Sequence, residues 1–188
     1  KFIYVIPAFQ NPSGRTWPIE RRKEFMEIIN KYEIPVAEDN PYGELRFEGE
    51  IFPSLKSYDT KGLVLFFGTF SKIFAPGFRL GWVSAAPEIL EKFNISKQAA
   101  DLQASTISQM EMAKFIEMYD LDAHVEKIKE VYGKRRTIML DAMDEYFPEG
   151  VTFTRTDGGL FTWVTLPEGI DAAQLMKDVV LPNNVAYV

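Results

Sequence analysis

The sequence predicts an α/β fold followed by a smaller α+β unit, and three observations support this. Short apolar runs alternate with longer segments of helical periodicity up to about residue 120. These runs are nearly continuous in apolar residues, as in parallel strands that are buried on both faces. Beyond that point the pattern changes to one long amphipathic segment, a hairpin signal and a short helix. We therefore expect one domain over residues 1–120 and a second, incomplete one over residues 121–188.

Strand and helix signals define the elements of the first unit. Apolar runs predict strands at residues 2–7, 34–37, 63–67 and 80–84. Pro18 opens a helix that is expected to end at residue 32, because Phe25, Ile28, Ile29 and Tyr32 recur at helical spacing. Pro87 opens a second helical stretch that reaches about residue 119, with a break near residues 102–105.

The second unit is expected to begin with a long helix over residues 124–146, which Pro148 and Gly150 end. Strands at residues 151–154 and 160–166 flank Asp157-Gly158-Gly159, a sequence typical of a hairpin turn. A short helix is expected at residues 171–180 and a strand-like run at residues 184–188. Because both ends of the sequence lie in strand-like runs, we expect the chain to be a fragment of a longer protein.

Composition excludes several classes of function. Hydrophobic residues make up 46% of the 188 residues, enough for a substantial core, and no apolar run is long enough to cross a membrane. The 21 basic and 27 acidic residues give a net charge of −6, which argues against a nucleic-acid partner. The absence of cysteine excludes thiolate metal sites and fits a reducing, cytoplasmic compartment. The single histidine, His124, leaves no multi-histidine metal site, so no metal is expected.

Polar clusters follow three of the expected strands. They are Phe9-Gln10-Asn11-Pro12-Ser13-Gly14, Glu38-Asp39-Asn40-Pro41-Tyr42-Gly43 and Gly68-Thr69-Phe70-Ser71-Lys72. Binding sites in parallel α/β sheets lie at the carboxyl ends of the strands. If the three strands share a sheet, the side chains that converge at one edge are those of Asn11, Asp39, Tyr42, Ser71 and Lys72, with Arg79 a short loop beyond.

This set of side chains suits a pyridoxal-phosphate site. A lysine behind a buried strand is a candidate Schiff-base nucleophile, and an acid can face a cationic ring nitrogen. Arg79 with Thr69 and Ser71 would make a phosphate clamp, because the guanidinium fork matches phosphate oxygens. A phosphate-binding domain of another kind remains an alternative. Taken singly, these residues also have structural explanations. Residues 11–14 would form a turn, Asp39 would brace a loop and Tyr42 would be a core aromatic. Arg79 would pair with a surface acid, and Lys72 would be solvated.

Four motifs in order resemble the class I/II pyridoxal-phosphate aminotransferases of fold type I. They are Asn11-Pro12-Ser13-Gly14, Glu38-Asp39-Asn40-Pro41-Tyr42-Gly43, Thr69-Phe70-Ser71-Lys72 and Pro76-Gly77-Phe78-Arg79-Leu80-Gly81. Gln10, Leu45-Arg46-Phe47 and Gly158-Gly159-Leu160-Phe161-Thr162-Trp163 narrow the resemblance to the 2-aminoadipate, kynurenine and broad-specificity aromatic or branched-chain subgroup. The resemblance spans essentially the whole chain. It implies the C-terminal portion of the large cofactor domain, with a mostly parallel sheet flanked by helices, and part of the small domain.

The resemblance also implies a role for each residue. Lys72 would form the Schiff base and then carry the proton between the substrate Cα and the cofactor C4′. Asp39 would keep the pyridine nitrogen protonated, and Asn11 and Tyr42 would donate to the phenolic oxygen. Thr69, Ser71 and Arg79 would hold the phosphate. The implied reaction is ping-pong transamination, in which an amino acid delivers its amine and a 2-oxo acid collects it.

The resemblance further implies a homodimer of a longer chain. The family's upstream phosphate loop and ring-stacking aromatic, and its downstream arginine for the substrate carboxylate, are not in these 188 residues, so we expect the fragment alone to be inactive. A different interpretation is the effector-sensing domain of a winged-helix transcription regulator, which would keep Lys72 and Asp39. Decarboxylase or lyase chemistry on the same scaffold is a third. We favour the aminotransferase because Gly159-Leu160-Phe161-Thr162-Trp163 resembles the enzymes.

Overall fold

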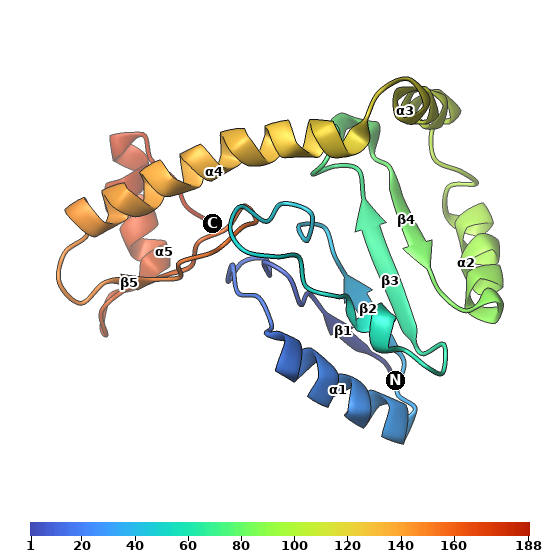
Figure 1. Cartoon of the computed structure of the whole chain (residues 1–188). Helices are drawn as coiled ribbons and strands as arrows, with labels where there is room; N and C mark the ends of the chain where they lie inside the picture. Colours follow the sequence, from blue (N-terminus) through green and yellow to red (C-terminus); the bar gives the residue numbers. More distant parts are fainter.

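A four-stranded sheet organises the first part of the chain in the computed structural model, which describes residues 1–188. The strands lie in the order β1-β2-β3-β4 (Figure 1). Strands β1, β2 and β3 are parallel, and β4 runs antiparallel to β3. The mostly parallel sheet expected from the sequence is therefore confirmed. The bounds are Ile3–Val5 for β1, Val36–Asp39 for β2, Val64–Thr69 for β3 and Gly81–Ser84 for β4.

Helix α1, Ile19–Tyr32, covers one face of the sheet (Figure 1). Its Met26 and Ile29 are fully buried against Val36, Leu55 and Val64 and form the main core cluster. The helix confirms the expected element, but the apolar stripe differs from the expected one. Its buried residues are Arg22, Met26 and Ile29, one face at helical spacing, whereas Ile28 and Tyr32 fall on the neighbouring face and are more than half exposed.

Three further helices follow the sheet. Helix α2, Pro87–Ala100, packs on the other face, where its Phe93 ring lies 5.9 Å from that of Phe67. The expected break separates it from α3, Thr106–Met118. Helix α4, Leu121–Tyr146, then runs from beside α3 towards the chain's C-terminal part (Figure 1). It starts three residues earlier than expected because the Asp120 carboxylate caps it by accepting the Ala123 N–H at 3.0 Å.

The hairpin after α4 is shorter than expected. Its strands β5, Thr152–Phe153, and β6, Val164–Thr165, are antiparallel but only two residues long. Asp157-Gly158-Gly159 does not form the expected tight turn, because another segment takes its backbone groups. The Phe47 N–H donates to the Asp157 carbonyl at 2.8 Å, and the Gly159 N–H donates to the Leu45 carbonyl at 2.9 Å. The hairpin is thereby joined to the loop that follows β2.

The chain ends in helical turns rather than in a strand. The expected helix at residues 171–180 is present as α5, Ala172–Leu175, and a wider turn, Met176–Val180; a last turn follows at Leu181–Asn183. The prediction of a strand at residues 184–188 is wrong, because this segment pairs with no other strand. It turns back instead, and the Val185 N–H donates to the Val180 carbonyl. No helix of the structure combines the length and the apolar character needed to cross a membrane. The division into two domains at residue 121 stays a prediction.

Two glycines permit the close approach between the hairpin and the first unit. A Cβ on Gly158 would lie 2.4 Å from the Leu45 carbonyl oxygen. Gly159 has a φ of +73°, and a Cβ there would lie 2.4 Å from the Phe9 Cβ. Because both distances are far below van der Waals contact, a larger residue would push the hairpin away from the loop that carries Asn11.

Gly159→Ala is expected to lower the free energy of unfolding of the full-length protein by about 2–4 kcal/mol, the sum of a left-handed backbone penalty and overpacking. Gly169→Ala is the matched control, because Gly169 also has a positive φ, +89°, but a Cβ at this position would meet no other atom within 4 Å. The control should cost about 1–2 kcal/mol. Urea unfolding measures both, and equal losses would contradict the tight contact with Phe9.

Candidate functional site

The carboxyl ends of β1, β2 and β3 meet at one edge of the sheet. Strand register aligns Val5 with Glu38 and Asp39 with Phe67, so the three loops that follow leave the sheet side by side. The polar clusters at residues 9–14, 38–43 and 68–72 lie in these loops and in the last residues of β2 and β3. The convergence expected from the sequence depended on the strands sharing one sheet, and that condition is met.

Lys72, Tyr42 and Asn11 form one group at this edge. The Lys72 Nζ lies 5.8 Å from the centre of the Tyr42 ring. Burial raises the pKa of the Tyr42 hydroxyl, a hydrogen bond with the Asn11 side chain opposes the rise, and the charge of Asp39 adds to it. The structure thus brings an amine, a phenol and an amide from three different loops into one small region.

Asp39 ends β2 and carries the carboxylate of the group. Its Oδ2 accepts a hydrogen bond from the Tyr4 hydroxyl on the neighbouring strand β1. Partial burial of this hydroxyl, and then the hydrogen bond to Asp39, raise the pKa of Tyr4 to about 12, although the residue as a whole is 56% exposed. The carboxylate is therefore held from one side by a donor that keeps its proton at neutral pH.

Thr69, Ser71 and Arg79 lie around the junction of β3 and β4. The Thr69 hydroxyl donates to the Leu80 carbonyl at 3.2 Å and accepts the Ser71 N–H at 3.1 Å. The Phe70 N–H donates to the same carbonyl at 3.0 Å, so both ends of the connecting loop are fastened together. Arg79, the residue before Leu80, is in the left-handed conformation with a φ of +54°. The three candidate phosphate ligands thus share one stretch of chain around Lys72.

The neighbouring carboxylate of Glu38 points to the opposite face, because successive strand residues alternate. It is 1% exposed and accepts the N–H groups of Leu55 at 2.8 Å and Lys56 at 2.9 Å. Burial raises the pKa of Glu38, while the two backbone bonds and the charge of Arg22 oppose that rise. Glu38 therefore fixes the segment that packs on α1 rather than serving the sheet edge.

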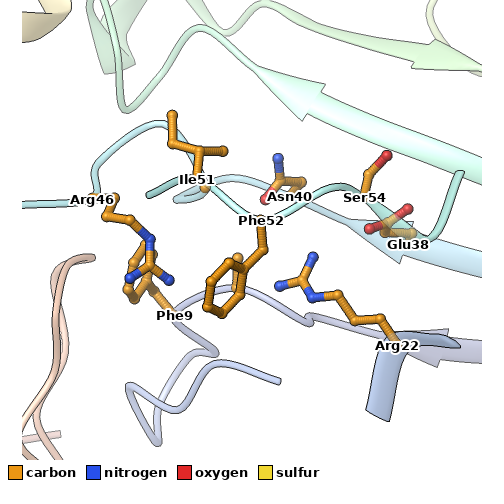
Figure 2. Close-up of a pocket in the computed structure, with 10 residues that line it drawn as sticks. Phe9, Arg22, Glu38, Asn40, Arg46, Ile51, Phe52 and Ser54 are labelled. Carbon is orange, nitrogen blue, oxygen red and sulfur yellow. The ribbon is translucent and has the colours of Figure 1, made fainter. Parts of the chain in front are cut away.

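A small cavity lies on the Glu38 side of the sheet, with a volume of about 30 Å³. Figure 2 shows the Arg22 guanidinium beside Phe52, with Arg46 and Phe9 at the other end. The Arg22 guanidinium donates to the carbonyls of Pro7 and Pro53 at 2.9 Å, and the Arg46 guanidinium lies 4.9 Å from the Phe9 ring centre. The cavity has room for about one water molecule and is therefore too small for a substrate. The hydrogen bonds of Arg22 to the Pro7 and Pro53 carbonyls link the surrounding loops instead.

The hairpin contacts two of the site loops directly. The Phe161 ring packs edge-on against the Tyr42 ring at 5.5 Å. The Thr154 hydroxyl donates to the Ser13 carbonyl at 3.0 Å, and a Cβ on Gly14 would lie 2.4 Å from the Phe161 carbonyl oxygen. The second part of the chain therefore holds the loops of Asn11 and Tyr42 in place.

The comparisons with known proteins agree with this architecture. Residues 2–188 match the family model described as aminotransferase class I and II. This mixed sheet with its flanking helices is the architecture of the fold type I aminotransferases. The chain belongs to the class I and II aminotransferase family.

Several relatives are described as aminotransferases. The chain is 48% identical over its whole length to aromatic-amino-acid aminotransferase 1 of Thermococcus litoralis, of which it spans 45%. It superimposes with a TM-score of 0.94 and 47% identity on the multiple substrate aminotransferase of Thermococcus profundus, covering all of this chain and 46% of that one. The chain also superimposes on the α-aminoadipate aminotransferase LysN of Thermus thermophilus, complexed with N-(5′-phosphopyridoxyl)-L-leucine. The TM-score is 0.95 and the identity 35%, and the match covers all of this chain and 48% of that one.

Transcription regulators are more distant relatives. The chain is 30% identical over 185 residues to the helix-turn-helix regulator NorG of Staphylococcus aureus, covering 98% of this chain and 42% of that one. In every one of these comparisons the chain spans about half the length of the matched protein or less.

Tyr4 contacts the candidate site through Asp39, and the sequence pattern does not single it out because it lies within the apolar run that predicts β1. One signal is present in the sequence: Tyr4 carries a hydroxyl in the middle of a strand that leads to Asn11, where an aliphatic residue would serve a buried strand equally well. Its reach to Asp39 depends on the register between β1 and β2, which the sequence does not specify.

Proposed function

We propose that the full-length protein is a pyridoxal-phosphate-dependent aminotransferase that works by a ping-pong reaction. An L-amino acid gives up its amino group and leaves as a 2-oxo acid, and a second 2-oxo acid takes that group and leaves as an amino acid. The observation that carries this proposal is the grouping of Lys72, Tyr42 and Asn11 beside Asp39 at one sheet edge. The family to which the chain belongs supports it.

The donor set at this edge fits pyridoxal phosphate. Lys72 offers an amine for its carbonyl carbon, and Asp39 a carboxylate for its ring nitrogen. Tyr42 and Asn11 offer donors to its phenolic oxygen, and Thr69, Ser71 and Arg79 offer hydroxyl and guanidinium donors to its phosphate. The phosphopyridoxyl compound in the LysN structure supports the same cofactor. No three His, Cys, Asp or Glu side chains group together in a way that could hold a metal ion.

The chain's own residues would divide the work between binding and proton transfer. When bound, pyridoxal phosphate supplies an electron sink for the pair released as the substrate Cα–H bond breaks. Lys72 would bind the cofactor covalently and, once substrate has displaced it, its amine would carry the proton from the substrate Cα to the cofactor C4′. The Asp39 carboxylate would hold a proton on the ring nitrogen. Tyr42 and Asn11 orient the ring, and Arg79 with Thr69 and Ser71 anchors the phosphate.

The proposed substrates are 2-aminoadipate and aromatic or branched-chain amino acids. Proteins similar to this chain are described as acting on aromatic amino acids, on multiple substrates and on α-aminoadipate. We also propose a homodimer of the full-length protein in the cytoplasm. The chain spans less than half of these relatives, so the remainder of each substrate site would come from residues outside it.

The alternative function is an effector-sensing domain of a transcription regulator. The similarity to helix-turn-helix regulators, at 30% identity, supports this alternative. The identity of 48% to an aminotransferase supports the enzyme instead. The two functions differ in what precedes residue 1 of this chain in the full-length protein, since a winged helix of roughly 70 residues plus a linker would indicate the regulator.

A donor screen tests the proposed function. The full-length protein with pyridoxal phosphate is incubated with one 2-oxo acid and a panel of aromatic, branched-chain, acidic and basic amino acids. We expect new amino acid from the 2-oxo acid with aromatic, branched-chain or 2-aminoadipate donors, and parallel double-reciprocal plots. Cofactor binding without any amine transfer would contradict the enzyme and favour the sensor, and release of carbon dioxide or an amine product would indicate decarboxylase or lyase chemistry.

A further inference from the structure

We propose that Tyr4 is a positioning residue for Asp39. Its hydroxyl donates to the Asp39 Oδ2. In this proposal that bond limits the rotation of the carboxylate that would pair with the ring nitrogen of the cofactor. This inference rests on the proposed function, because it assigns a purpose to a contact made by the acid of that site. Tyr4 itself touches neither substrate nor cofactor in this proposal.

Strand register explains how the two side chains meet. Tyr4 of β1 is aligned with Ala37 of β2, and Asp39 lies two residues further along β2. Because side chains two apart on a strand share a face, Tyr4 and Asp39 lie on the same face and are diagonal neighbours. A tyrosine is long enough to cover this diagonal, which a serine or threonine at the same position would not span.

The surroundings of Tyr4 indicate a polar role rather than a packing role. Its neighbours Ile3 and Val5 pack against the core cluster beneath α1. Tyr4 points to the other face and, within these 188 residues, belongs to none of the hydrophobic clusters. A phenylalanine would fill the same space. The feature that distinguishes tyrosine here is the hydroxyl, and that hydroxyl is bound to Asp39.

The bond has the properties that a positioning contact needs. Its donor sits in the middle of a strand, with two rotatable side-chain bonds, so little freedom is lost in making it. The raised pKa, about 12, keeps the hydroxyl a donor at every pH where the protein would work. The bond takes Oδ2, and it is the one side-chain hydrogen bond that the structure gives to this carboxylate. Removing it would leave Asp39 free to rotate about its side-chain bonds.

The test is a double-mutant cycle in the full-length protein. Four proteins are compared: wild type, Tyr4→Phe, Asp39→Ala and the double variant. The matched control is Tyr32→Phe, which removes a hydroxyl from an exposed tyrosine at the end of α1. The readouts are the dissociation constant of pyridoxal phosphate, kcat and KM for one donor, and the thermal midpoint of the cofactor-free protein.

We expect Tyr4→Phe to raise the cofactor dissociation constant about tenfold, as for the loss of one hydrogen bond to a charged group. The value of kcat should fall while KM for the donor stays unchanged, and the thermal midpoint should match that of the control. In the Asp39→Ala background the same substitution should change the dissociation constant by less than about twofold, because the acceptor is gone.

Two results would overturn the inference alone: a Tyr4→Phe protein that binds cofactor like the Tyr32→Phe control, or an effect that persists undiminished in the Asp39→Ala background. A different result would overturn the proposed function together with it. If Asp39→Ala binds pyridoxal phosphate as tightly as wild type, then Asp39 is not the partner of the ring nitrogen, and Tyr4 has no acid to position.

Discussion

Replacing Lys72 by alanine is expected to abolish transamination by the full-length protein while leaving its fold nearly intact. The loss in kcat should be at least about 10³-fold, because one side chain supplies both the covalent attachment and the proton transfer. The fold should survive because Lys72 is only partly buried and takes part in none of the ion pairs of the structure. Its neighbour Ile73, by contrast, is buried in a core cluster with Leu45 and Val125.

Two companion variants make the Lys72 experiment specific. Lys72→Arg keeps the positive charge but cannot act as a nucleophile or base at neutral pH, so it should be as inactive as Lys72→Ala. Lys61→Ala removes an exposed lysine that pairs with Glu33 and should retain wild-type activity. Rates are followed for each half-reaction by the cofactor's absorption. Substantial turnover by Lys72→Ala would contradict the assignment.

Replacing Asp39 by alanine or asparagine is expected to lower kcat by several orders of magnitude, about 10²–10⁴-fold. Without the carboxylate the ring nitrogen loses its proton, and the cofactor becomes a weaker electron sink for the substrate Cα. Asp39→Asn is the sharper test, because it keeps the size of the side chain and can still accept the bond from Tyr4. Steady-state kinetics with a saturating donor measure the loss. Near-normal kcat in Asp39→Asn would contradict the role given to this carboxylate.

The adjacent carboxylate provides the control for Asp39. Glu38 lies one residue earlier on β2, but its side chain faces α1 and accepts the backbone N–H groups of Leu55 and Lys56. Glu38→Gln should therefore lower the free energy of unfolding by about 1–3 kcal/mol, the cost of leaving a buried donor unpaired, and leave kcat largely unchanged. Asp39→Asn should instead lower kcat and leave the free energy of unfolding largely unchanged. Two neighbouring acids are thereby distinguished by strand alternation alone.

Much of the sheet can be predicted because its signals are local. Apolar runs that stop at polar clusters indicate buried strands, and parallel strands bring their carboxyl ends together. These two rules predict that Asn11, Asp39, Tyr42 and Lys72 share one edge, and the structure groups them there. The roles of these residues toward the cofactor stay predictions.

Features that depend on contacts between distant segments could not be predicted. Tyr4 reaches Asp39 only through the register of two strands that a helical crossover separates in the sequence. Asp157-Gly158-Gly159 has the composition of a hairpin turn, but residues 45–47 compete for its backbone groups. Such competition is decided by packing, which local composition does not describe.

The most direct test of the central claim is to reduce the full-length protein with borohydride in the presence of pyridoxal phosphate and to map the modified peptide by mass. Borohydride makes a bond between a lysine amine and the cofactor permanent. The account predicts one phosphopyridoxyl group per chain, on the peptide that contains Lys72, and none on the Lys72→Ala protein. A label on another lysine, or no label on folded protein, would contradict it.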